Sequence, residues 1–103
     1  MKIERQFVVP VLEDERVSSL VVLSLAVEVD AGESDIVFEH EPKLRDAFLS
    51  VLFTHAQSRG FDGDFTQERR LEDLRGSLTN AAQEVLGKRA HGILLTGIVR
   101  QDI

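Results

Sequence analysis

The segment 17–29 is rich in aliphatic residues along its whole length and contains neither glycine nor proline. Apolar residues at every second position are typical of a β-strand with one buried face. One face of this strand is entirely apolar and comprises Val21, Leu23, Leu25, Val27 and Val29. The other face is mixed, with Leu20, Val22 and Ala26 among Ser18, Ser24 and Glu28. The segment therefore predicts a strand in a sheet that is covered on one side only.

The chain has 103 residues, which is enough for one hydrophobic core but too few for two. We therefore expect a single domain over residues 1–103. Hydrophobic residues make up 43% and charged residues 29%, a balance that favours a folded domain over a disordered one. The net charge of −6 repels phosphates and anionic lipids, so nucleic acid is not expected as a partner.

The chain has no cysteine, which excludes disulfides, thiol nucleophiles and thiolate metal sites. Its longest nearly apolar stretch, 20–27, is interrupted by Ser24 and is far shorter than the ~20 residues that a membrane-spanning helix needs. Two alternatives stay open: a soluble protein, or an ectodomain whose membrane anchor lies upstream.

Two further strands are expected. The segment 6–12 is rich in Val, and Pro10 within it favours an edge position, where a missing N–H is tolerated. A charged turn over 13–16 joins it to the strand 17–29 as a hairpin. The last strand covers 93–101, with Ile93, Leu95 and Val99 predicted to share one face.

Helices are predicted between the second and third strands. Ser34 is the expected N-cap of a short helix that leads to His40. Pro42 fits the first turn of the next helix, because its missing N–H leaves no hydrogen bond unmade there. The apolar stripe of that helix is Leu44, Ala47, Phe48, Val51, Leu52 and His55.

A third helix follows a glycine-containing loop over 58–64. Either Asp64 or Thr66 is its expected N-cap, Gly76 is expected to face solvent, and Gly87 is expected to end it. Its apolar stripe is Leu71, Leu74, Leu78, Ala81, Val85 and Leu86. The predicted fold class is α+β: a small antiparallel sheet of about three strands with an antiparallel helix pair on one face.

Few residues are spaced in a way that suggests metal binding or catalysis. His40, His55 and His91 lack the spacing of a helical metal site. Asp62-Gly63-Asp64 with Glu68 resembles a calcium loop only faintly, since the further oxygen ligands are missing, and a glycine turn is the favoured interpretation. Glu39 and Glu41 fit a solvated helix start better than an acid–base pair. We therefore expect no enzyme activity, no metal and no cofactor.

Some residues are better candidates for contact with another protein. Phe61 and Phe65 flank the glycine loop, and two exposed aromatic residues there would form a contact patch. The favoured alternative is that one or both fold back onto the third helix. Val8 lies on the first strand, whose edge can accept a partner's strand, although Pro10 and the acidic turn beside it discourage such pairing.

Three segments in order resemble the FliL family of flagellar basal-body proteins. Residues 39–52, with Arg45-Asp46-Ala47 at their centre, resemble the family's Pro-led helix. Residues 74–86 and 93–101 are similar to its later helix and its final strand. The chain departs from the family pattern at Gly97, where an acidic residue is usual, and at Pro10-Val11, where an Asn-Leu pair is usual.

The resemblance implies a single-span inner-membrane protein with a stomatin-like periplasmic domain. Such a protein associates with the stator units of the flagellar motor, forms oligomers around them and has no catalytic chemistry. The resemblance also implies a membrane anchor upstream of Lys2. The alternatives are a stomatin-like scaffold unrelated to motility, and a small ligand-binding domain or enzyme of unknown substrate.

Overall fold

A computed structural model describes residues 1–3 and 5–103. The hairpin strands are β1 (Phe7–Glu13) and β2 (Arg16–Glu28), and the chain ends in β3 (Gly92–Asp102). Between them lie the helices α1 (Ser34–Glu39), α2 (Glu41–Gln57) and α3 (Glu68–Leu86), followed by a short 3₁₀ turn (Gly87–Arg89).

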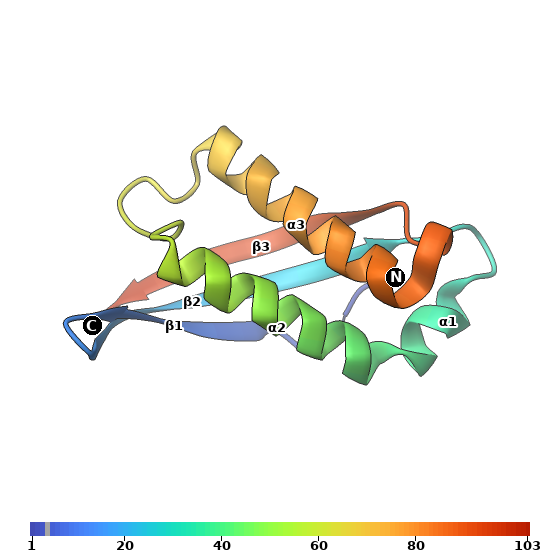
Figure 1. Ribbon diagram of the computed structural model, residues 1–103, viewed down its shortest axis with the longest axis horizontal. Coiled ribbons are helices and arrows are strands. Elements are labelled where there is room, and N and C mark those ends of the chain that lie inside the picture. The colour runs from blue at the N-terminus through green and yellow to red at the C-terminus, as the bar shows by residue number, and fades with distance from the viewer. Residues whose placement is uncertain (4) are drawn as a thin grey trace.

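The three strands form one antiparallel sheet in the order β1-β2-β3. Both long helices lie on the same side of this sheet, as Figure 1 shows. The predicted α+β class is therefore confirmed, and so are the edge position of the strand that contains Pro10 and the antiparallel pairing of the last strand with the second.

The core lies between the sheet and the two long helices. Val21, Leu23, Leu25 and Val27 of β2 are fully buried, which confirms the predicted apolar face of the central strand. On the same face of the sheet, the buried side chains of α2 are Leu44, Phe48 and Leu52, and those of α3 include Leu74, Leu78, Ala82 and Leu86. Each large apolar side chain buried in this way contributes about 1.5–3 kcal/mol.

The prediction that Val99 shares a face with Ile93 and Leu95 is wrong. Ser24 pairs with Gly97 and Leu25 pairs with Leu95, so β3 carries one extra residue, Thr96, at a bulge. Because side chains alternate along a strand, an extra residue moves every later side chain to the opposite face. Ile98 consequently packs against the core, whereas Val99 is 56% exposed on the outer face.

The predicted N-caps are also wrong. Ser34 is the first residue of α1, and the cap position before it is Glu33, whose N–H already bonds to the carbonyl of Asp30 in a turn. For α3 the cap position is Gln67. Asp64 and Thr66 lie in the preceding turn and bond to each other at 3.3 Å, so their side chains do not reach the helix.

Other helix predictions are confirmed. Pro42 lies in the first turn of α2, and Gly87 ends α3 with φ +66°, a left-handed conformation that favours glycine. Gly76 is exposed on α3, and an added Cβ there would meet no atom within 4 Å.

Arg45 fastens the N-terminal stretch to α2. Its guanidinium donates to the carbonyls of Arg5 at 3.1 Å and Gln6 at 2.8 Å. The same group lies 4.3 Å from the centre of the Phe7 ring, which packs edge-on against Phe48. Arg45 thus joins backbone hydrogen bonds and a cation–π contact in one side chain.

We expect Arg45→Met to lower the free energy of unfolding by about 1–2 kcal/mol, because methionine keeps the aliphatic stem but loses the hydrogen bonds and the cation–π contact. Urea denaturation measures the change. Lys43→Met, at an exposed position of the same helix, is the control and should stay within about 0.5 kcal/mol of the original chain. Equal losses in the two variants would contradict this role of Arg45.

Candidate interaction surfaces

Each of the three histidines contacts a different part of the structure. His40 Nδ1 lies 2.9 Å from the carbonyl oxygen of Ile36, and His91 Nε2 lies 2.8 Å from a carboxylate oxygen of Asp30. His55 packs inside the loop that follows α2. Over residues 1–3 and 5–103, no three His, Asp or Glu side chains come close enough to hold a metal ion.

The acidic residues of the 58–67 loop take part in its own turns. Asp62 forms an ion pair with Arg59 at 3.2 Å, and Asp64 accepts a hydrogen bond from Thr66. Gly63 between them has φ +56°. This arrangement is that of a glycine turn, the interpretation favoured from the sequence.

Phe61 and Phe65 differ in exposure. Phe61 is only 1% exposed, and its ring meets that of His55 edge-on with 4.7 Å between centroids. It has folded back, but its aromatic neighbour belongs to α2 and not to α3. Phe65 is half-buried, with the Arg100 guanidinium 4.7 Å from its ring centre. In this conformation Phe61 offers no surface to a partner, whereas Val8 is 52% exposed.

Two arginines hold the loop against the domain. Arg100 of β3 donates to the carbonyls of Phe61 at 3.0 Å and Gly63 at 2.9 Å. Arg70 of α3 donates to the carbonyl of Asp62. The loop that carries both phenylalanines is therefore attached at three consecutive carbonyls, which limits the movement that exposure of Phe61 requires.

The surroundings of His55 shift its pKa. Burial lowers its pKa below the usual 6.5, and Arg70 lowers it further, whereas the Gly60 backbone and Asp73 oppose these effects. Its Nε2 atom is buried and has no hydrogen-bond partner among the described residues. The ring lies directly against Gly60, where a Cβ would approach Nε2 to 2.2 Å. Neutral His55 therefore fits this site better than the charged form.

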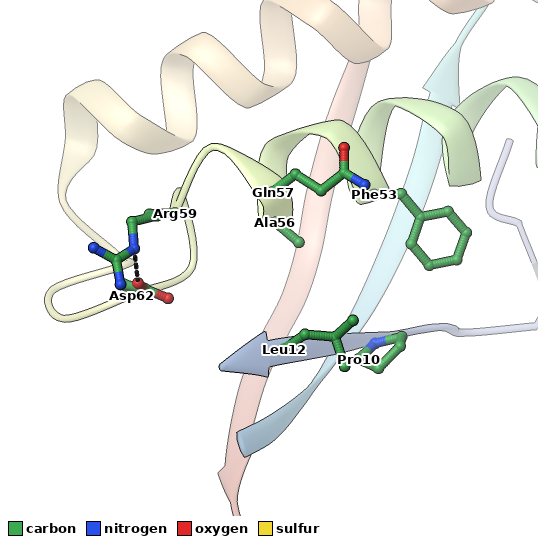
Figure 2. Close-up of a pocket in the computed structure, with 7 residues that line it drawn as sticks. All are labelled: Pro10, Leu12, Phe53, Ala56, Gln57, Arg59 and Asp62. Carbon is green, nitrogen blue, oxygen red and sulfur yellow. Dashed lines mark ion pairs between the residues drawn. The ribbon is translucent and has the colours of Figure 1, made fainter. Parts of the chain in front are cut away.

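An apolar groove lies along the edge of β1. Pro10 and Leu12 of β1 face Phe53, Ala56 and Gln57 of α2, and the Arg59–Asp62 ion pair lies at one end (Figure 2). Its volume is about 410 Å³, and Leu12 and Phe53 are 63% and 43% exposed. The sequence analysis missed this groove, although Phe53 could have signalled it as an apolar residue outside the buried stripe of α2.

The outer face of the sheet is the second apolar surface. Within residues 1–3 and 5–103, both long helices pack on the inner face, and none covers the outer one. Val8, Leu94 and Val99 are 52%, 46% and 56% exposed there, each beside a half-buried residue of β2. Large exposed apolar patches of this kind mark sites of protein–protein contact.

Comparison with known families identifies the family of this chain. Residues 1–101 match the family described as flagellar basal body-associated protein FliL. The chain belongs to the FliL family. A search of curated proteins finds no match. The FliL family is a flagellar accessory family, so this chain is associated with the flagellar basal body and with motility.

No helix in the described part of this FliL-family chain has the length and apolar character needed to cross a bilayer. The family match covers all the segments on which the resemblance rested, including the Arg45-Asp46-Ala47 turn whose arginine fastens the N-terminal stretch.

We expect Gly60→Ala to destabilise the domain by about 1–3 kcal/mol, because the added methyl group collides with the ring of His55. Gly76→Ala is the matched control and should stabilise α3 by about 0.5–1 kcal/mol, since the site is open and alanine favours helix. Thermal unfolding of the two variants distinguishes the sites. A Gly60→Ala variant as stable as the original chain would contradict the close packing of His55.

We expect the free energy of unfolding to fall as pH drops below about 6.5, where His55 of the unfolded chain gains a proton that the folded chain resists. Above that pH, His55 is neutral in both the folded and the unfolded chain, so no stability is lost through its protonation. Urea denaturation near neutral and mildly acidic pH measures the decline, before most carboxylates titrate. His55→Gln should flatten it, whereas His91→Gln should retain it. A decline that His55→Gln leaves unchanged would assign the effect to other groups.

Proposed function

We propose that this chain is a flagellar motor accessory domain that binds stator units and also self-associates. The main support for the proposal is the outer face of the sheet, where Val8, Leu94 and Val99 are exposed in a chain of the FliL family. Protein–protein contact is what such a face can supply, because aliphatic side chains offer contact area and no reactive groups.

The groove beside β1 supplies a second contact surface in this proposal. Leu12 and Phe53 are the exposed apolar side chains of the groove, and Gln57, Arg59 and Asp62 provide polar groups around them. An apolar centre with a polar rim is the usual composition of a protein interface. Stator units and further copies of this chain can therefore use separate surfaces. The contact roles first predicted for Val8, on the outer face, and for half-buried Phe65 remain part of this proposal. The role predicted for Phe61 would require that its ring leave the buried site against His55.

The domain is placed in the periplasm in this proposal, joined to an inner-membrane anchor that precedes it. Its two termini lie at opposite ends of a body 44 Å long (Figure 1). The N-terminal backbone pairs with the end of β2 at Val27, whereas Ile103 bonds to Ser18 beside the hairpin. An anchor before residue 1 would hold the N-terminal end nearest the membrane and direct the hairpin end and the groove away from it. The stomatin-like character implied by the family stays a prediction.

We expect deletion of the gene to slow or abolish swimming while flagella are still assembled, because an accessory protein supports the motor without building the filament. Video tracking of cells, with flagella counted by electron microscopy, measures both effects. Normal swimming of the deletion strain would overturn the motor role and favour the scaffold unrelated to motility. Loss of the filaments themselves would place the protein in assembly and not in rotation.

A further inference from the structure

We propose that the free edge of β3 binds an extended segment of a stator subunit that carries lysine or arginine, and that this segment adds to the sheet as a fourth strand. This inference rests on the proposed function and deepens its stator-binding part, because it names the surface and the chemistry of the bound segment. Three features support it: the difference between the two edges of the sheet, an acidic groove beside β3, and a glycine in the helix that flanks this groove.

The edge formed by β1 is closed to a docking strand. Leu25 of β2 accepts a backbone hydrogen bond from Ile3 on the β1 side of the sheet. Because backbone groups alternate between the two sides of a strand, Val21 points the same way and meets Val9 of β1. Pro10 therefore points to the open edge, where its missing N–H deprives a docking strand of a hydrogen bond.

The edge formed by β3 has no such obstacle. Leu23 and Leu25 point towards β1, so their partners on β3, Ile98 and Leu95, direct their N–H and C=O groups away from β2. Arg100 follows the same alternation. Within the described residues β3 pairs on one side only, and it contains no proline (Figure 1). Unpaired backbone groups at alternate residues are what a further strand requires.

An acidic groove of about 480 Å³ lies between this edge and α3. Its lining includes the carboxylates of Glu28, Glu72 and Asp73 but one guanidinium, that of Arg75. The three acidic residues are exposed, and none forms an ion pair within residues 1–3 and 5–103. Gly92 lets Glu28 reach the edge, since an added Cβ there would lie 3.1 Å from a carboxylate oxygen. The groove therefore favours a segment with positive charge.

Gly76 leaves room on the helix side of the groove. It lies in the interior of α3 and lines the groove, and an added Cβ would meet no atom within 4 Å. Glycine weakens the interior of a helix relative to alanine, and no contact within the described chain requires it here. A glycine does allow the backbone of a bound segment to approach closely. Thr79, one turn further along α3, continues the same low flank.

These features together define the segment that fits. The unpaired groups of β3 bind an extended backbone, whereas a helix would leave them without partners. The carboxylates select lysine or arginine through charge-assisted hydrogen bonds and repel acidic segments. A second copy of this chain carries a net charge of −6 and is therefore less suited to the groove.

Binding is tested with a synthetic peptide of ten residues in which three lysines alternate with valine and threonine. Fluorescence anisotropy of the labelled peptide, titrated with the purified 103-residue chain, measures Kd. We expect saturable binding that weakens as the salt concentration rises, because salt screens the attraction between lysines and carboxylates. The same peptide with glutamate in place of each lysine should not bind.

Amide hydrogen exchange followed by NMR shows where the peptide lies. The outward amides of Leu95, Ile98 and Arg100 should exchange at least about 10-fold more slowly when the peptide is bound, because each gains protection by a partner strand. Val99 and Gln101 point to β2 and should change little. Such alternate protection is specific to an added strand, since binding on a face of the sheet gives no alternation of amides.

Two pairs of variants test the groove, and all four positions are exposed. Gly76→Gln fills the groove and should weaken binding about 10-fold or more. Ser77→Gln adds the same side chain on the flank that faces α2 and should bind like the original chain. Glu72→Lys should weaken binding about 3- to 10-fold by reversing one charge. Glu84→Lys makes the same reversal outside the groove lining and is the control.

The identity of the partner is tested in cells. A photo-crosslinking amino acid at Thr96, which is exposed on β3, should capture a stator subunit, whereas the same group at Glu84 should not. Capture of a different protein at Thr96 would overturn the assignment to the stator.

Other outcomes would overturn the proposal as well: a lysine peptide that does not bind, a Gly76→Gln variant that binds it as tightly as the original chain, or equal protection of Val99 and Ile98. Protection of the outward amides by a rise in the chain's own concentration would assign the edge to a second copy. Swimming of the deletion strain tests the motor role separately. Normal swimming together with intact peptide binding would reject the stator as partner and leave the edge as a site for another protein.

Discussion

Burial of the inner face of β2 under α2 and α3 is the interaction on which the rest of this structure depends. Val21, Leu23, Leu25 and Val27 are completely buried, and β2 is also the only one of the three strands that pairs on both sides. This face lies at the centre of the core, while α2 also contacts β1 and α3 also contacts β3 at its two sides. Because the helices occupy one side, the arrangement also determines which apolar side chains of the sheet stay exposed.

The loops and termini are held to this core by arginines that bond to backbone carbonyls. Arg45 secures the stretch before β1, and Arg70 and Arg100 secure the loop between α2 and α3. A guanidinium suits this task because it donates several hydrogen bonds in a plane while its flat face covers an aromatic ring. Phe7 and Phe65 receive such contacts from Arg45 and Arg100. Side-chain contacts thus fix these irregular segments in a chain that has no cysteine.

The bulge in β3 links the fold to the proposed function. Had β3 continued in its original alternation, Val99 would face the helices and Ile98 the outside. The extra residue at Thr96 instead places Val99 beside Val22 on the outer face and puts Gly97 next to Ser24. One inserted residue therefore decides which side chains of the second half of β3 contribute to the exposed face of the sheet. The same bulge brings Arg100 to the inner side, where it reaches the loop that carries Phe61 and Phe65.

The sequence by itself determined the class of the fold, since the alternation over 17–29, the helical stripes and Pro10 each reflect a local preference that burial reinforces. The sequence also determined the family, because the segments 39–52, 74–86 and 93–101 follow one another in the order typical of that family. Only the tertiary structure decided the face of Val99, the burial of Phe61 and the groove between Leu12 and Phe53. Each of these depends on how separate helices, strands and loops meet, and neither a register shift nor a ring buried under a loop leaves a periodic signal. Local patterns specify elements, whereas the surfaces available for binding follow from how those elements cover one another.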